Sequence, residues 1–110
     1  MTGPAVPAVS VDQLPADAAL LDVRESDEWA AGHAPSATHL PMSELTSRMG
    51  ELPDGDPLYV VCRSGGRSAR VVAFLSGQGY PAVNVEGGMQ AWARQGREVV
   101  ADGGAEPQII

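Results

Sequence analysis

Short apolar segments alternate along the chain with polar segments in which apolar residues recur at helical spacing. The apolar segments cover residues 8–11, 19–23, 38–41, 57–62 and 82–85. The helical patterns between them cover residues 26–32, 43–50, 68–79 and 88–96. This alternation predicts a parallel α/β organisation, because parallel strands need a crossover connection that is usually a helix.

Several of these segments carry further signals. The run 57–62 is continuously apolar, as expected for a strand covered on both faces. Ser26 is the expected N-cap of the first helix, and two acidic residues in its first turn complement the helix dipole. The helix over 68–79 ends in glycine, and its spacing predicts an apolar face formed by Ala69, Val72, Ala73 and Leu75.

The chain length fits a single domain over residues 1–110, which is long enough to bury a core without disulfides or metals. We expect the core of the domain to span about 8–100, with residues 1–7 and 101–110 as loose tails. The alternative for the second tail is that Ile109 and Ile110 pack back on the domain.

The charge of the chain narrows its partners and its location. The net charge of −7 argues against nucleic acid or an anionic membrane as a partner. The first residues lack the charged start of a signal peptide, and no apolar run is long enough to span a membrane. We therefore expect a cytoplasmic protein.

The chain holds one cysteine, Cys62, at the end of the continuous apolar run. A single cysteine excludes an internal disulfide, and two histidines with scattered carboxylates form no metal motif, so we expect neither metal nor cofactor. Every basic residue is arginine, and three of the seven lie within eight positions after this thiol: Arg63, Arg67 and Arg70.

The loop that follows Cys62 has the composition of an anion site. Ligands bind in α/β folds where a strand leads into a helix, and a glycine-rich loop there can turn its N–H groups toward an anion. The helix dipole and two nearby arginines would also favour a thiolate. A lone cysteine is more often a buried, inert residue, but these polar, cationic neighbours favour a nucleophile, with the expected binding residues Arg63, Ser64, Gly65, Gly66, Arg67 and Ser68.

Three ordered motifs resemble the single-domain rhodaneses, a family of sulfurtransferases. They are "LLDVRESDEWAAGHAPSATHLP" (Leu20–Pro41), "CRSGGRS" (Cys62–Ser68) and "NVEGGMQAW" (Asn84–Trp92), within about 10–96. One departure is Ser36, which stands where the family most often has glycine. The resemblance implies one rhodanese-like α/β domain of five short, mainly parallel strands with helices on both faces, and a persulfide carried by Cys62.

Loop length separates two kinds of chemistry on this architecture. Cysteine phosphatases have five residues between cysteine and arginine, whereas four separate Cys62 from Arg67. The shorter loop suits the outer sulfur of thiosulfate or a persulfide. Two guanidinium groups suit the dianion thiosulfate. The alternatives are a phosphatase or arsenate reductase, for which Asp22, Asp27 or Glu86 would have to supply the acid, and a non-catalytic interaction module.

The resemblance implies a thiosulfate sulfurtransferase whose acceptor is cyanide, an external thiol or a sulfur-carrier protein. Because no second cysteine can take the sulfur, the acceptor must be another molecule. Asp22 and Arg24 are interpreted as a structural pair that braces the loop, with Glu28 as a third member. We expect His33 to be structural, neither His33 nor His39 to be a base, and both Trp29 and Trp92 to be core residues. The remaining singled-out residues are expected to be structural or solvated: Arg70, Glu86, Gly87 and Gly88.

Overall fold

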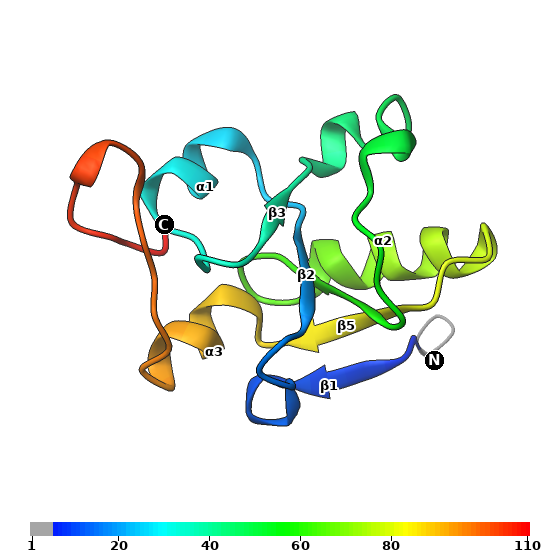
Figure 1. Ribbon diagram of the computed structural model, residues 1–110, viewed down its shortest axis with the longest axis horizontal. Helices are drawn as coiled ribbons and strands as arrows, with labels where there is room; N and C mark the ends of the chain where they lie inside the picture. The colour runs from blue at the N-terminus through cyan, green and yellow to red at the C-terminus, as the bar shows by residue number, and fades with distance from the viewer. Residues whose placement is uncertain (1–5) are drawn as a thin grey trace.

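The computed structural model describes residues 6–110, in which five strands form one parallel sheet (Figure 1). The order across the sheet is β1-β5-β4-β2-β3, and every neighbouring pair is parallel. The predicted five-stranded α/β architecture is therefore confirmed. The strands are β1 (Ala8–Ser10), β2 (Ala19–Asp22), β3 (Thr38–His39), β4 (Leu58–Val61) and β5 (Ala82–Glu86).

Helices connect the strands, as parallel pairing requires. The α-helices are α1 (Ser26–Ala31), α2 (Gly66–Gly77) and α3 (Gly88–Arg94). Short 3₁₀ turns complete the regular structure: η1 (Val11–Gln13), η2 (Met42–Glu44), η3 (Met49–Glu51) and η4 (Asp102–Gly104).

Two apolar clusters lie on opposite faces of the sheet, because successive side chains of a strand point to opposite sides. One cluster packs β2 and β4 against α2, and its buried members include Leu21, Leu58, Val60, Val72 and Leu75. The other lies on the side of α3 and η1, and includes Val11, Leu20, Val61, Met89 and Trp92. The continuous apolar run in β4 supplies both clusters, which explains why it does not alternate with polar residues.

The helix predicted over 43–50 is wrong. The chain instead makes the two separate 3₁₀ turns η2 and η3. The Ser47 hydroxyl donates to the carbonyl of Glu44, so a side chain competes with the backbone for an acceptor that a helix would use. Leu45 is the one fully buried residue of this stretch, and Met49 packs against the same cluster only partly buried, so a helix here would gain little extra burial over two turns.

Two helix starts also differ from the prediction. The N-cap of α1 is Glu25 rather than Ser26, and the Glu28 carboxylate accepts from the Glu25 N–H at 3.0 Å. Helix α2 begins at Gly66, two residues before the predicted start. Its buried face contains Val71, Val72 and Leu75, whereas Ala73 is exposed, so the predicted face is rotated.

The two tryptophans have different environments. Trp92 is buried, as predicted, and its Nε1–H donates to the carbonyl of Glu98 at 2.8 Å. Trp29, also predicted to be core, is only partly buried. Its ring stacks with the imidazoles of His33 and His39, with ring centroids 3.6 and 4.7 Å away.

The segment after α3 returns to the region of α1 (Figure 1). His33 and Val100 form an antiparallel bridge, and the Gln108 N–H donates to the carbonyl of Ala31 at 2.8 Å. Ile109 lies partly buried against the α3-side cluster, and Ile110 is exposed. The predicted loose segment 1–7 falls mostly outside the described residues.

Residues 6–110 were compared with the requirements of a membrane-spanning helix and of a metal site. None of the helices there has the length and apolar character needed to cross a membrane. The same residues contain no group of three or more His, Cys, Asp or Glu side chains that could hold a metal ion.

Candidate active site

Cys62 lies immediately after β4, at the edge of the sheet where the parallel strands have their carboxyl ends. The sequence predicted Cys62 to be the last residue of the strand. In the structure β4 ends at Val61, and Cys62 is the first residue of the loop. Only 1% of the residue is exposed. The loop leads into α2, whose 12 residues give a helix dipole with its positive end toward the sulfur.

Hydrogen-bond donors of the loop converge on the Cys62 sulfur. The N–H of Gly65 donates to Sγ at 3.1 Å, and the Ser68 hydroxyl lies 3.3 Å from it. Gly65 has φ of 112°, a left-handed conformation that glycine adopts easily. Gly66 has no positive φ and has open space beside its Cα, so of these two glycines only Gly65 has a backbone conformation that favours glycine.

The surroundings of Cys62 act on its acidity in opposite directions. Burial raises the pKa of the thiol, because a charge is disfavoured away from water. Hydrogen bonds from the Ser68 hydroxyl and from the backbone N–H groups of Ser68, Gly65 and Ser64 outweigh burial and hold the pKa below its ordinary value of 9.0. The thiolate is therefore stabilised by one hydroxyl and several backbone N–H donors of the loop and of the first turn of α2.

The start of α3 holds the first two carbonyls of the loop. The N–H groups of Met89 and Gln90 donate to the carbonyls of Cys62 and Arg63 at 2.8 and 3.0 Å. A side chain at Gly88 would collide with the Cys62 carbonyl and lie 2.7 Å from that of Arg63. Gly88, the first residue of α3, therefore permits the close approach of this helix to the loop carbonyls.

Asn84 of β5 is a second anchor, and the sequence reasoning did not identify it. Its side chain is buried, accepts from the Ser68 hydroxyl, and donates from Nδ2 to the carbonyl of Gly65 at 3.3 Å. The signal was available in the sequence, since a polar residue inside the apolar strand "AVNV" needs a hydrogen-bond partner.

Arg67, at the end of the loop, is held by a carboxylate from α1. Its Nη1 and Nη2 donate to the two oxygens of Glu28 at 2.7 and 2.8 Å. The hydrogen bonds from Arg67 lower the pKa of Glu28, and the Glu28 carboxylate raises the pKa of Arg67. The negative charge of the Cys62 thiolate also raises the pKa of Arg67, by less than the Glu28 carboxylate does.

Asp22 and Arg24 form a buried ion pair, with 2.7 Å between Arg24 Nη2 and Asp22 Oδ2 and neither side chain exposed. Arg24 also donates to the carbonyls of Glu28 and Gly32 at 3.3 and 2.7 Å. The pair therefore braces α1 directly and reaches the loop through the Glu28–Arg67 contact. Glu28 contacts Arg24 through its carbonyl and Arg67 through its carboxylate, and its side chain is not a third member of the buried pair.

The histidines are occupied by backbone carbonyls. His33 Nδ1 lies 2.7 Å from the Trp29 carbonyl, and His39 Nε2 lies 2.7 Å from the Arg24 carbonyl. Neither histidine has a hydrogen bond to the Cys62 sulfur within the described residues.

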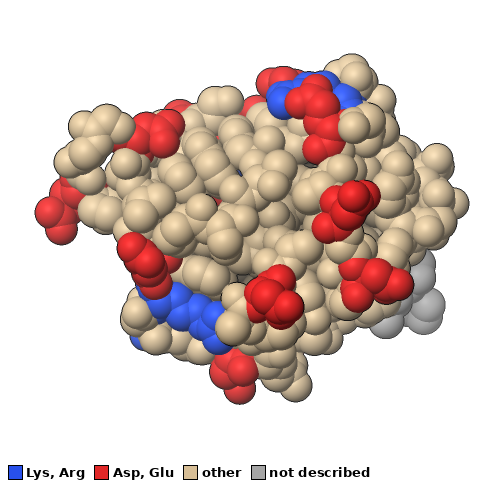
Figure 2. All heavy atoms as spheres, in the orientation of Figure 1, with Lys and Arg blue, Asp and Glu red and all other residues tan. Residues whose placement is uncertain are grey.

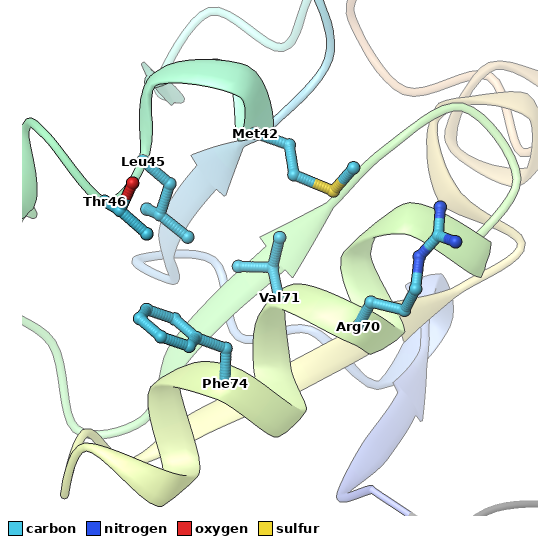
Figure 3. A pocket seen from close by; sticks show the side chains of 6 residues that line it. All are labelled: Met42, Leu45, Thr46, Arg70, Val71 and Phe74. Carbon is cyan, nitrogen blue, oxygen red and sulfur yellow. The ribbon is translucent and has the colours of Figure 1, made fainter.

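The remaining candidates lie at the rim or away from the sulfur. Arg63, Ser64 and Glu86 are exposed, and Arg63 forms no ion pair with residues 6–110. Arg70 and Met42 lie at one end of a hollow of about 410 Å³ between η2 and α2 (Figure 3). No residue of the segment 62–67 lines that hollow, so the Cys62 sulfur is not part of it.

The site thus combines a nucleophile with an anion cradle. A thiol with a lowered pKa supplies a thiolate that can attack an electrophilic atom. The nearby N–H groups can stabilise negative charge on an atom transferred to the sulfur.

Comparisons with known proteins agree with this geometry. The family model for the rhodanese-like domain matches residues 8–95. A protein named "Sulfurtransferase" from Allochromatium vinosum is 44% identical over 89 residues, which cover 80% of this chain and 83% of that protein. A "Putative sulfurtransferase YtwF" from Bacillus subtilis is 50% identical over 74 residues, 66% of this chain and 71% of that protein.

A solved structure gives the same result for the fold. The rhodanese-related protein from Thermoplasma volcanium is 35% identical and superposes with a TM-score of 0.80, covering 87% of this chain and 99% of that one. The family model covers most of the chain, and a relative and a solved structure agree with it, so the chain belongs to the rhodanese-like domain family.

Proposed function

We propose that this protein is a sulfurtransferase that carries sulfur as a persulfide on Cys62 and takes it from a small anionic donor such as thiosulfate. The observation that carries the proposal is the donation of the Gly65 N–H, over 3.1 Å, to a cysteine sulfur with lowered pKa. Relatives 44% and 50% identical to this chain bear the name sulfurtransferase, which supports general sulfur transfer.

The first half-reaction loads the enzyme. The Cys62 thiolate attacks the outer sulfur of thiosulfate, and the new S–S bond forms as the bond between outer and inner sulfur breaks. Sulfite leaves with the electron pair of the broken bond. The product is a Cys62 persulfide anion, so the total charge is unchanged and no oxidant or reductant is needed.

The second half-reaction empties the enzyme. A thiophilic acceptor such as cyanide attacks the terminal sulfur, the persulfide bond breaks, and thiocyanate leaves while the thiolate is restored. Cys62 is the only cysteine in the chain, so an internal disulfide cannot complete the cycle. We propose an external thiol or a sulfur-carrier protein as the acceptor in the cell, which is consistent with a reducing cytoplasm.

The residues of the loop have separate roles in this proposal. The amides of Ser64, Gly65 and Ser68 stabilise the thiolate and then the terminal sulfur. Arg63 is exposed at the rim and is free to meet an incoming anion. Asp22 is an unsuitable acid for the phosphatase alternative, because its carboxylate is committed to Arg24.

The test is the intact mass of the protein after incubation with thiosulfate, beside a Cys62→Ser variant. The expected result is a gain of one sulfur atom that is absent from the variant and removed by cyanide with release of thiocyanate. A wild-type protein whose mass does not change with thiosulfate, mercaptopyruvate or an organic persulfide would overturn the proposal. Cys62-dependent hydrolysis of a phosphate ester in the same preparation would support the phosphatase instead.

A further inference from the structure

Arg67 and Glu28 form an ion pair at the rim of the cradle, between the loop and α1. Two hydrogen bonds of 2.7 and 2.8 Å join the guanidinium to both carboxylate oxygens. The side chains are 28% and 14% exposed, so water screens the pair only in part. An arginine that would otherwise present a positive charge to an incoming anion is therefore already neutralised.

Glu28 is fixed in this position by its neighbours. Its Oε1 also accepts from the N–H of Glu25, and its own carbonyl accepts from Nη1 of the buried Arg24. The Glu25 carboxylate in turn accepts from the Ser43 hydroxyl at 2.9 Å. Glu28 is therefore held against Arg67 by contacts that do not involve the loop.

The rest of the molecule offers an anion little attraction at long range. The chain has a net charge of −7, and acidic side chains are spread over the face shown in Figure 2. Groups near the sulfur must then determine how strongly a charged donor is bound. They include the loop amides, Arg63 and Arg67, which attract an anion, and the carboxylates of Glu28 and Glu25, whose charges act on Arg67. Of the two carboxylates, Glu28 is the one that is hydrogen-bonded to Arg67.

We propose that Glu28 is a positioning residue that sets the charge selectivity of the site, holding Arg67 back from the donor and so disfavouring dianions relative to less charged donors. The proposal rests on the proposed function in that the donor is taken to react at Cys62. A dianion must either displace the Glu28 carboxylate from Arg67 or bind beside an intact ion pair. Both routes cost binding free energy that a neutral reagent does not lose.

Charge selectivity is measurable without any sulfur transfer. Iodoacetate and iodoacetamide alkylate the same thiolate and differ by one negative charge. The ratio of their rate constants at one pH cancels the fraction of thiolate and reports how the site receives an anion. In Glu28→Gln, which keeps an oxygen to accept from the Glu25 N–H, we expect this ratio to rise about fivefold, and to rise less at high salt.

A double variant separates neutralisation from structural support. Glu28→Gln/Arg67→Gln lacks both charges, and its ratio should stay close to that of the wild type if the pair is neutral toward an anion. A matched control is Glu44→Gln, because Glu44 pairs with Arg48 on the surface. A ratio that is unchanged or lower in Glu28→Gln, or far below wild type in the double variant, overturns the proposal.

The same variants then predict a change in donor use. In Glu28→Gln, KM for thiosulfate should fall about fivefold, while kcat measured with cyanide changes little. A higher KM would mean that Glu28 presents Arg67 to the donor, and would overturn the proposal. If the alkylation ratio rises but no variant forms a persulfide, the charge selectivity stands and the proposed function fails.

Discussion

The hydroxyl oxygen of Ser68 lies 3.3 Å from the sulfur of Cys62, in a fully buried position. The hydroxyl has one proton and also lies within hydrogen-bond distance of the Asn84 side-chain oxygen and the Gly65 carbonyl, so it can donate to only one of these three acceptors at a time. Donation to the sulfur is most favourable when Cys62 is charged, because hydrogen bonds to ions are stronger than those between neutral groups. Ser68 therefore links the charge state of Cys62 to the anchor at Asn84.

Replacing Ser68 by alanine should raise the pKa of the Cys62 thiol. The change removes a donor that lowers the pKa and leaves burial, which raises it, in place. Because the thiolate is the reacting species, the alkylation rate near neutral pH should fall about threefold to tenfold. The measurement is the iodoacetamide rate constant as a function of pH.

Ser76→Ala is the matched control, since Ser76 is exposed on the same helix. Its pH profile should match that of the wild type. A Ser68→Ala profile that coincides with the wild-type profile would show that the backbone N–H groups alone set the acidity of the thiol.

The sheet and the loop position were predictable from the sequence because burial on two faces leaves a direct pattern. The apolar run ending at Cys62 fills both clusters, and parallel topology then places the following loop at the carboxyl edge of the sheet. The helix predicted over 43–50 was wrong because the spacing of apolar residues does not show side-chain hydrogen bonds. The Ser47 hydroxyl donates to the Glu44 carbonyl and so satisfies it without a helix.

The partners of the loop were less predictable because they are far away in the sequence. Arg67 and Glu28 are 39 residues apart in the sequence, and Arg24 contributes to their contact by bonding the Glu28 carbonyl in α1. The sequence placed the arginines beside the thiol but could not show that one of them is already paired. Asn84 differs, since a polar residue in a buried strand is a local signal that was overlooked.

The two adjacent glycines of the loop should respond differently to alanine. Gly65 has a positive φ, and a Cβ there would also approach the Gly87 nitrogen to 3.4 Å, so Gly65→Ala should cost about 1–2 kcal/mol of stability. Gly66 is the first residue of α2 with open space around it, and Gly66→Ala should be neutral or stabilise by up to about 1 kcal/mol. Urea unfolding of both variants measures this, and equal losses would contradict the assigned backbone roles.

Removing one member of the buried Asp22–Arg24 ion pair should cost more stability than removing both members. Arg24→Met leaves a buried carboxylate without its partner and should lower the free energy of unfolding by about 3–5 kcal/mol. The double variant Arg24→Met/Asp22→Leu removes both charges and should recover part of that loss. Urea unfolding of Arg24→Met, of Asp22→Leu and of the double variant gives the coupling energy between the two side chains. Additive losses would show that the two side chains stabilise the fold independently.

The Glu28–Arg67 pair should make stability depend on acid in a defined direction. Hydrogen bonds from Arg67 hold the pKa of Glu28 in the folded protein below its ordinary value of 4.5, so the folded state binds fewer protons than the unfolded state there. The stabilisation is fully present above pH 4.5 and is lost as pH falls through the folded pKa. In urea unfolding at a series of pH values, the difference between wild type and Glu28→Gln should be constant near neutral pH and shrink in acid. A difference that grows as the pH falls would mean that the carboxyl is held in its protonated form, and the ion pair would then be excluded as the reason for the position of α1 against the loop.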